Sequence, residues 1–298
     1  MEPAPSLDDL LASHLVEDAA FARAYAAHGP EERARLKTCA AMALASRPGA
    51  GPMREERLQG ASGLCVARRR TARPWALLVM GADLASPVRP LAAACAARLH
   101  GVEQVAAAFL APGKSLPLSV LTALELAGVE QVARLDSAAA RELAAFLAQS
   151  REPGAVLALG LQACQWAREF PAMAWRGPAL WLEPRTGRLG VWAQGVEWDW
   201  EALRFAHPDA EFLLCGKDGG DAGKALGAPA DLKSEPSLQA LLGRGLDALF
   251  APPEVLDAAA ADPQAPQLML GPGCESCWFH AGLGPAVLAL ECEIWTSA

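Results

Sequence analysis

Residues 91–105 (LAAACAARLHGVEQV) and residues 118–132 (LSVLTALELAGVEQV) end in the same five-residue word, GVEQV, which begins at Gly101 and again at Gly128. In each copy we expect an Ala/Leu-rich helix to end at the glycine, because glycine takes the left-handed conformation that closes many helices. An apolar strand follows within a few residues. Two such units in tandem predict parallel strands joined by helices, since consecutive parallel strands need a crossover connection.

The segments around this repeat continue the alternation. Strands are expected at residues 75–80, 103–109, 130–135, 154–159, 211–215, 247–250 and 266–270. Helices are expected at residues 87–100, 117–127, 137–149, 161–169, 199–206, 236–244 and 253–261. Residues 178–182 and 189–193 flank the turn sequence PRTG and are expected to pair as a hairpin. The whole pattern is typical of a doubly wound α/β protein with mostly parallel sheets.

The first 74 residues have a different character. Residues 6–46 show helical periodicity with a break at Gly29, and two helices are expected there. Residues 47–63 are rich in glycine and proline, which favours a linker or surface loop. The basic run at residues 68–70 is expected to be a solvated edge rather than an anion site. The glycine-rich residues 216–223 are expected to form a surface loop.

Composition limits the classes of function. The chain has 298 residues, of which 52% are hydrophobic and 20% charged, as in a globular protein with a large core. A net charge of −8 argues against nucleic acid or an anionic membrane as the main partner. No apolar run reaches the length of a membrane span, and the N-terminus is acidic where a secretory signal is basic. A cytoplasmic location, with the eight cysteines reduced, is therefore expected.

Several words in a fixed order resemble histidinol dehydrogenase from about residue 60 onward. Strand–loop–helix words of that family are similar to residues 78–105 (LVMGADLASPVRPLAAACAARLHGVEQV) and 117–135 (PLSVLTALELAGVEQVARL). Later family words are similar to residues 158–161 (ALGL), 180–194 (LWLEPRTGRLGVWAQ), 203–210 (LRFAHPDA) and 252–257 (PPEVLD).

The resemblance implies two Rossmann-like domains, each an incomplete doubly wound, mostly parallel sheet, with one domain inserted in the other. Residues 75–197 would be the inserted domain. Residues 1–74, with the N-terminal helices and the linker, would pack with residues 198–298 as a discontinuous α/β domain. A ligand would bind in the cleft between the domains.

The departures from the family concern its chemistry. Glycines that let the backbone pass close to cofactor and substrate are replaced, among others, by Met80, Leu159 and Leu161. Of the family's zinc ligands only His207 has a match, and the Glu-His acid/base pair is reduced to Glu254 followed by a valine. The resemblance therefore implies a catalytically degenerate protein, with no cofactor expected, that binds a small metabolite or a protein partner.

An active enzyme is the alternative. It would be an NAD-dependent oxidoreductase acting on an alcohol group through Glu254 and His207. The loops at residues 80–84 and 158–161 discriminate between the two hypotheses, because a dinucleotide needs room between them. Any oligomer is expected to differ from the family's dimer, with residues 6–46 as the candidate surface.

A second alternative is a zinc site near the C-terminus. Cys274, Cys277, His280 and Cys292 supply four suitable ligands at a spacing that can close around zinc. A loop packed on the core with two reduced thiols explains the same residues, so both interpretations stay open.

Overall fold

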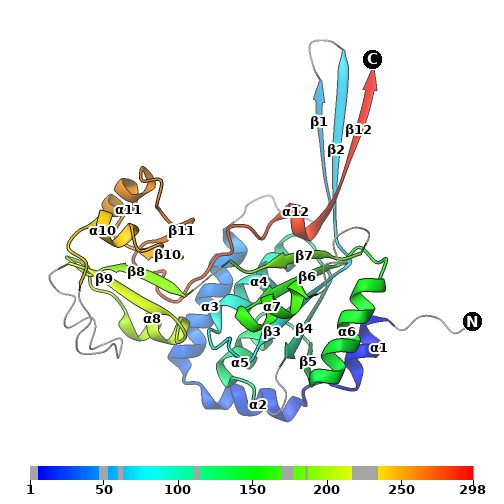
Figure 1. The fold of residues 1–298 in the computed structure, drawn as a ribbon, viewed down its shortest axis with the longest axis horizontal. Helices are drawn as coiled ribbons and strands as arrows, with labels where there is room; N and C mark the ends of the chain where they lie inside the picture. Colours follow the sequence, from blue (N-terminus) through cyan, green and yellow to red (C-terminus); the bar gives the residue numbers. More distant parts are fainter. Residues whose placement is uncertain are drawn as a thin grey trace, which may run out of the picture.

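The computed structural model describes residues 6–46, 53–59, 63–110, 115–169, 177–184, 187–216 and 234–297. Within these residues the strands form sheets of five, four and three strands. Figure 1 shows the first two sheets in the body of the molecule and the third standing away from it. The α/β class with parallel, Rossmann-like sheets that the sequence predicts is confirmed.

The five-stranded sheet has the order β5-β4-β3-β6-β7 and is parallel throughout. Its strands are β3 (Trp75–Gly81), β4 (Gln104–Leu110), β5 (Gln131–Leu135), β6 (Ala155–Leu159) and β7 (Ala179–Leu182). All seven residues of β3 are buried, as expected for a central strand covered on both faces. The chain runs from β3 outward to β5 and then returns to β6 on the other side of β3. The topological switch point therefore lies at the carboxyl ends of β3 and β6.

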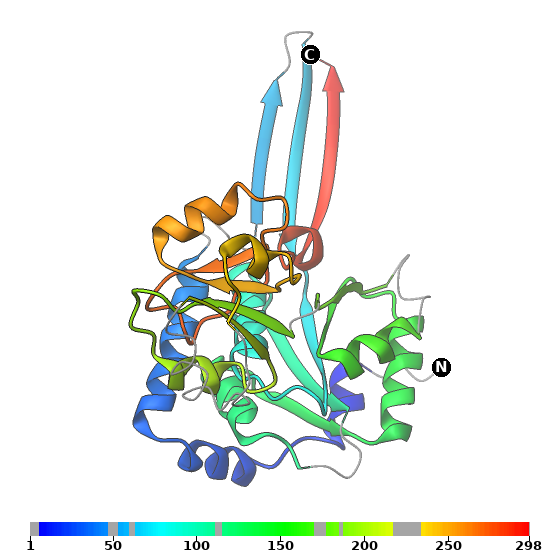
Figure 2. The ribbon, with the colours of Figure 1, turned by 60° about the vertical axis from the view of Figure 1, so that its left-hand side comes forward.

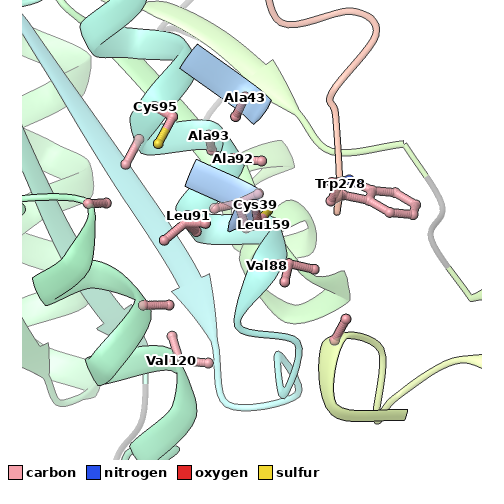
Figure 3. Close-up of a cluster of buried hydrophobic side chains, with 14 of the residues drawn as sticks. Cys39, Ala43, Val88, Leu91, Ala92, Ala93, Cys95, Val120, Leu159 and Trp278 are labelled. Carbon is pink, nitrogen blue, oxygen red and sulfur yellow. The ribbon is translucent and has the colours of Figure 1, made fainter. Parts of the chain in front are cut away.

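Four helices connect these strands: α4 (Val88–Leu99), α5 (Leu118–Leu126), α6 (Ser137–Gln149) and α7 (Leu161–Arg168). Gly101 and Gly128 follow α4 and α5 with φ of 84° and 70°, which confirms the left-handed helix ends that the repeat predicts. One face of α4 is packed in the apolar cluster of Figure 3, together with Leu159 and Trp278.

The N-terminal segment forms three helices, α1 (Leu7–Ala12), α2 (Asp18–Ala27) and α3 (Pro30–Ala45), instead of the two expected. The break at Gly29 lies where the sequence predicts it. Helix α2 packs against α5, and α3 packs against α4 and also contacts α8. The division of the chain at residues 74 and 197 stays a prediction.

The four-stranded sheet has the order β11-β10-β8-β9. Its strands are β8 (Arg188–Trp192), β9 (Glu211–Cys215), β10 (Ala248–Phe250) and β11 (Leu268–Leu270), and its helices are α8 (Trp200–Ala206), α10 (Leu238–Leu242) and α11 (Pro253–Ala260). The hairpin predicted at residues 178–193 is wrong, since β7 pairs with β6 whereas β8 pairs with β9 and β10, all in parallel. Both strands are largely apolar on both faces, so each belongs in a covered parallel sheet, and the turn carries the chain from one sheet to the other.

The three-stranded sheet is antiparallel and consists of β1 (Met53–Gln59), β2 (Leu64–Ala72) and β12 (Ala289–Ser297), with α12 (Pro285–Leu288) leading into β12. The loop predicted for residues 47–63 is therefore wrong over β1, and residues 47–52 and 60–62 lie outside the described part. The basic run lies on β2 as a solvated strand whose arginines pair with glutamates of β1 and β12.

Two further expectations concern single segments. Most of the glycine-rich loop predicted at residues 216–223 lies outside the described part, which ends at Gly216 and resumes at Ser234. None of the helices in the described part has the length and apolar character needed to cross a membrane.

Candidate ligand-binding cleft

The carboxyl ends of β3 and β6 are joined by a carboxylate. Asp83 follows β3, and its Oδ2 accepts hydrogen bonds from the backbone N–H of Leu161 (2.7 Å) and Gln162 (3.3 Å) in the first turn of α7. In return, the Ala82 N–H donates to the side-chain oxygen of Gln162 at 2.9 Å. The loops at residues 80–84 and 158–161, between which a dinucleotide would need room, are therefore in direct contact at the switch point.

The close contact depends on Gly81. A Cβ built at this position would lie 2.1 Å from Oδ1 of Asp83 and 2.7 Å from Cβ of Gln162. Any other residue would push the two loops apart. Gly81 is thus required for the contact between the two loops.

The replaced family glycines do not fill the cleft as the sequence suggests. Met80 and Leu159 are fully buried within the core of the five-stranded sheet, while Leu161 is 64% exposed at the rim of the cleft. Strand alternation explains the difference, because side chains at the end of a buried parallel strand point into the layers of helices. Asp83, rather than Met80 or Leu159, occupies the switch point.

A buried ion cluster forms the base of the cleft. Arg89, in the first turn of α4, donates from both Nε and Nη2 to the carboxylate of Glu183, with an Nε–Oε1 distance of 2.8 Å. Its Nη1 donates to Asp209 at 2.8 Å. Glu183 also accepts the backbone N–H of Gly160 at 2.8 Å. Arg89 and Glu183 are only 5% and 6% exposed.

This cluster connects three separate parts of the chain. Arg89 lies on α4, Glu183 directly follows β7, and Asp209 follows α8 beside the four-stranded sheet. Burial alone would lower the pKa of Arg89, but Glu183 and Asp209 outweigh it and raise that pKa above its ordinary value. The guanidinium therefore stays charged, and its ion pairs link the five-stranded sheet to the four-stranded sheet at the base of the cleft.

His280 completes the cluster as a neutral imidazole. Its Nε2 lies 2.9 Å from the carbonyl oxygen of Arg89, which only accepts, so Nε2 carries the proton. Its Nδ1 accepts the indole N–H of Trp278 at 3.3 Å. Burial lowers the pKa of His280. The residue thus orients the backbone of α4, with both ring nitrogens committed to Arg89 and Trp278.

The two expected acid/base residues are not brought together. His207 is buried, and its ring packs against Phe250 and Trp278 at centroid distances of 5.9 and 5.3 Å. Its Nε2 has no hydrogen-bond partner, and burial lowers its pKa to about 3. Glu254 lies exposed in the first turn of α11. Neither residue lines the cleft.

The four residues of the possible zinc site do not come together as one group, although the thiols of Cys274 and Cys277 are neighbours. Cys277 is buried with its Sγ 3.2 Å from Sδ of Met42, whereas Cys292 is exposed on β12. The neighbouring thiol of Cys277, together with burial, raises the pKa of Cys274. Across the described ranges no group of three or more His, Cys, Asp or Glu side chains is placed to hold a metal ion.

The cleft above the ion cluster has a volume of about 780 Å³. One wall comes from the five-stranded sheet, with Asp83, Cys164 and Arg168, and the other from the four-stranded sheet, with Arg188 and Asp247. The Cys164 thiol donates to the carbonyl oxygen of Ala158 at 3.4 Å, and burial raises its pKa. It is therefore a protonated, structural thiol instead of a nucleophile.

Sequence reasoning missed Asp83, Arg89, Glu183 and Asp209. A usable signal was present for two of them. Asp83 and Glu183 lie within two residues of the ends of apolar strands, and ligand sites of open α/β sheets lie at those carboxyl ends. Arg89 gave no such signal, because an arginine in the first turn of an Ala-rich helix is normally at the surface.

Comparison with known proteins places the chain by fold alone. No family model and no curated protein sequence matches it. Among solved structures it is similar to histidinol dehydrogenase from Elizabethkingia anophelis, with a TM-score of 0.58 and 10% identity over 100% of this chain and 86% of that one. A NAD-dependent benzaldehyde dehydrogenase from Corynebacterium glutamicum gives 0.53 and 10% over 89% and 77%. Succinate-semialdehyde dehydrogenase from Burkholderia pseudomallei gives 0.51 and 9% over 90% and 77%. The similarity is thus to the dehydrogenase fold as a whole.

Proposed function

We propose that this protein has the fold of a dehydrogenase without its chemistry, and that its cleft binds a small polar metabolite. The observation that carries the proposal is the carboxylate of Asp83 on the first turn of α7. In open α/β sheets, the phosphates of a dinucleotide bind at the switch point against a helix N-terminus. Here that place holds a negative charge supplied by the chain itself.

A dinucleotide would have to displace Asp83 from two backbone N–H donors. It would also have to separate the loops that Gly81 allows to touch. The other helix N-terminus at this crevice, that of α4, has Pro87 and Pro90, which have no N–H to offer to a phosphate, and its Arg89 is committed to Glu183. The residues present do not fit NAD.

The acid/base residues support the same proposal. Alcohol oxidation needs a group near the substrate that gains and loses a proton near neutral pH. His207 fails because its pKa is about 3 and its ring is enclosed by aromatic side chains, and Glu254 is exposed outside the cleft. Zinc does not fit either, since the described residues place no group of three His, Cys, Asp or Glu side chains around His207.

The cleft itself suits a ligand. Its volume of about 780 Å³ lies in the range of small-molecule sites. Its rim carries the exposed guanidinium of Arg168, which forms no ion pair among the described residues, and its opposite wall carries Arg188 paired with Glu211 at 3.2 Å. A free cation at the rim favours a metabolite with a carboxylate or another small anionic group.

Two measurements test the proposal. Isothermal titration with NAD⁺ and NADH should give no heat of binding, and histidinol with NAD⁺ should give no NADH, with or without added zinc. A thermal-shift screen of small carboxylates should find compounds that raise Tm. The shift should disappear in Arg168→Gln and persist in Arg204→Gln, an exposed arginine outside the cleft.

The outcomes are decisive in both directions. Saturable binding of NAD⁺, or turnover of an alcohol or aldehyde, would refute the loss of chemistry and restore the active-enzyme alternative. Asp83→Asn removes the charge while keeping the shape, and we expect it to remain inactive because the proton carrier is missing as well.

A further inference from the structure

Sulfur atoms from two distant parts of the chain lie together beside α3. Cys39 and Met42 lie on α3, three positions apart and therefore on the same face of the helix. Cys274 and Cys277 lie in the segment between β11 and α12. Figures 1 and 2 both show this segment, coloured between orange and red, passing beside α3 on its way to α12.

The side chains of these two parts are in contact. The thiol of Cys277 donates to the thioether of Met42 at an Sγ–Sδ distance of 3.2 Å. The thiols of Cys39 and Cys274 are both neighbours of the Cys277 thiol. Cys277 and Met42 are 235 positions apart in sequence, so the fold brings this sulfur cluster together.

The backbone fixes the position of the two thiols in the loop. The Cys277 N–H donates to the carbonyl oxygen of Cys274 at 2.9 Å, which closes a turn, and the Cys274 N–H donates to that of Gly271 at 3.2 Å. The Ser276 hydroxyl donates to the carbonyl oxygen of Arg35 on α3 at 3.5 Å. The two thiols are therefore held against α3 by the loop itself.

The cluster combines one buried thiol with groups that reach the surface. Cys277 is 0% exposed, whereas Cys274 and Met42 are half-buried. A small ion can therefore enter from solvent past Cys274 and Met42, and once bound it is shielded from water on the side of Cys277.

The kind of sulfur decides which metal fits. Thiolate and thioether sulfur are soft ligands, and together they favour monovalent copper, Cu(I). Structural zinc takes four ligands from thiolate, imidazole and carboxylate groups, and the described part of the chain places no three such side chains to hold a metal ion. An iron–sulfur cluster of the usual type needs four cysteine thiolates. Two thiolates and one thioether therefore suit Cu(I).

We propose that Cys274, Cys277 and Met42 bind one Cu(I) ion. On binding, each of the two thiols releases its proton to solvent and its sulfur forms a bond to copper, while the thioether of Met42 contributes a lone pair. Copper stays monovalent, so no electron is transferred. Cys39, which is buried in the apolar core, stays outside the ligand set.

The Met42 side chain is suited to this role. Its sulfur now accepts the thiol proton of Cys277, so a lone pair already points to the place where the metal would replace that proton. The gap between the two sulfur atoms has to widen when copper enters. Methionine is unbranched and has three rotatable bonds, so it can move outward without a change in the backbone.

The test is the transfer of Cu(I) from a chromogenic chelator to the protein, without oxygen and with the cysteines reduced. The wild-type chain should take up one equivalent, and its Tm should rise because a ligand of the folded state stabilises it. Cys274→Ser should lose both the uptake and the rise in Tm. Met42→Leu removes the sulfur at similar volume and should raise the Kd about tenfold or more, since even residues behind the ligands commonly change metal affinity about 10- to 100-fold.

Cys292→Ser is the matched control, because Cys292 is an exposed thiol on β12 and its replacement should leave the Kd and the rise in Tm unchanged. Near-UV circular dichroism checks that each variant is folded, and Met42→Leu decides the question if Cys274→Ser is not. A wild-type chain that takes no Cu(I) from the chelator would overturn the proposal. So would a wild-type Kd in Met42→Leu or in folded Cys274→Ser, or a loss of uptake in Cys292→Ser, because the copper would then be held elsewhere.

Discussion

β3 and β2 are each the central strand of a sheet, yet all seven residues of β3 are buried and none of β2 is. The difference follows from sequence. β3 (WALLVMG) is apolar on both faces and is covered by two layers of helices, whereas β2 (LCVARRRTA) has three consecutive arginines, which no single-chain core accommodates. The stability of β3 therefore comes from burial in the core, whereas β2 is held by its strand pairing and by exposed ion pairs.

The ion pairs of the two regions differ in the same way. Arg89 and Glu183 are buried at the base of the cleft, whereas the side chains of Arg68 and Glu293 are 47% and 42% exposed on the three-stranded sheet. A buried charge that loses its partner has no water to replace it, but an exposed one does. An Arg–Glu pair is thus important for stability at the base of the cleft, whereas on the three-stranded sheet it contributes little to the free energy of unfolding.

Glu183→Gln should cause the largest loss of stability. The substitution keeps the shape of the side chain but leaves Arg89 paired with Asp209 alone, with Asp83 as a more distant counter-charge, and breaking a buried pair costs about 3–5 kcal/mol. The free energy of unfolding, measured in urea, should fall by that amount. A loss below about 1 kcal/mol would mean that water reaches Arg89 and that the cluster is not a structural link.

The next effect tests the central strands directly. Leu78→Ala on β3 removes a fully buried side chain and should cost about 2–5 kcal/mol, because the packed layers on both sides cannot close the cavity. Val66→Ala on β2 should cost about 0.5 kcal/mol or less, as for other surface changes. Urea unfolding at low protein concentration measures both, and equal losses would remove the contrast between the strands.

The local sequence pattern predicts those elements whose own residues supply the buried face or the helix cap. The run 75–80 predicted β3 because every residue in it is apolar, and residues 137–149 match α6, where Asp136 caps the first turn. The sheet of β1, β2 and β12 is not predicted because its strands carry many charges, and because the pairing of β2 with β12 joins residues more than 200 positions apart. The hairpin prediction is wrong because the turn signal is local, whereas β7 pairs in parallel with β6, and β8 pairs in parallel with β9 and β10.

The candidate site was less predictable than the fold. His207 is predicted from the similarity of residues 203–210 to a histidinol dehydrogenase motif, and such a similarity carries no information on burial. In the structure its ring is enclosed by Trp278 and Phe250. Arg89 and Glu183 are 94 residues apart in sequence, so nothing local indicates that they meet. The composition of the candidate site depends on which loops the sheet topology brings together, and that is known only from the structure.

Acid should weaken the body of the molecule through its buried histidines. Folded His207 takes up a proton only near pH 3, whereas in the unfolded chain it does so near pH 6.5, so the unfolded state binds more protons between these values. Its contribution is complete above pH 6.5 and is lost as the pH falls, by about 1.4 kcal/mol per pH unit. His280, whose pKa is also lowered, adds to the loss.

Unfolding in urea at pH 7 and pH 5 measures this slope. His207→Phe keeps an aromatic ring against Trp278 and Phe250 and should flatten the slope, because it removes one of the groups that the unfolded chain protonates. An unchanged slope in this variant would mean that His207 is hydrated in the folded state.

The smallest effect is expected for Glu293→Gln on the three-stranded sheet. The side chains of Arg68 and Glu293 are 47% and 42% exposed, so the loss of this pair should lower the free energy of unfolding by only about 0–1 kcal/mol. The effect should shrink further in high salt, because dissolved ions screen exposed charges. Unfolding of the wild type and the variant in urea, at low and high salt, measures both values. A loss of about 3 kcal/mol or more that salt does not change would contradict the contrast with Glu183, because only a pair shielded from water behaves in that way.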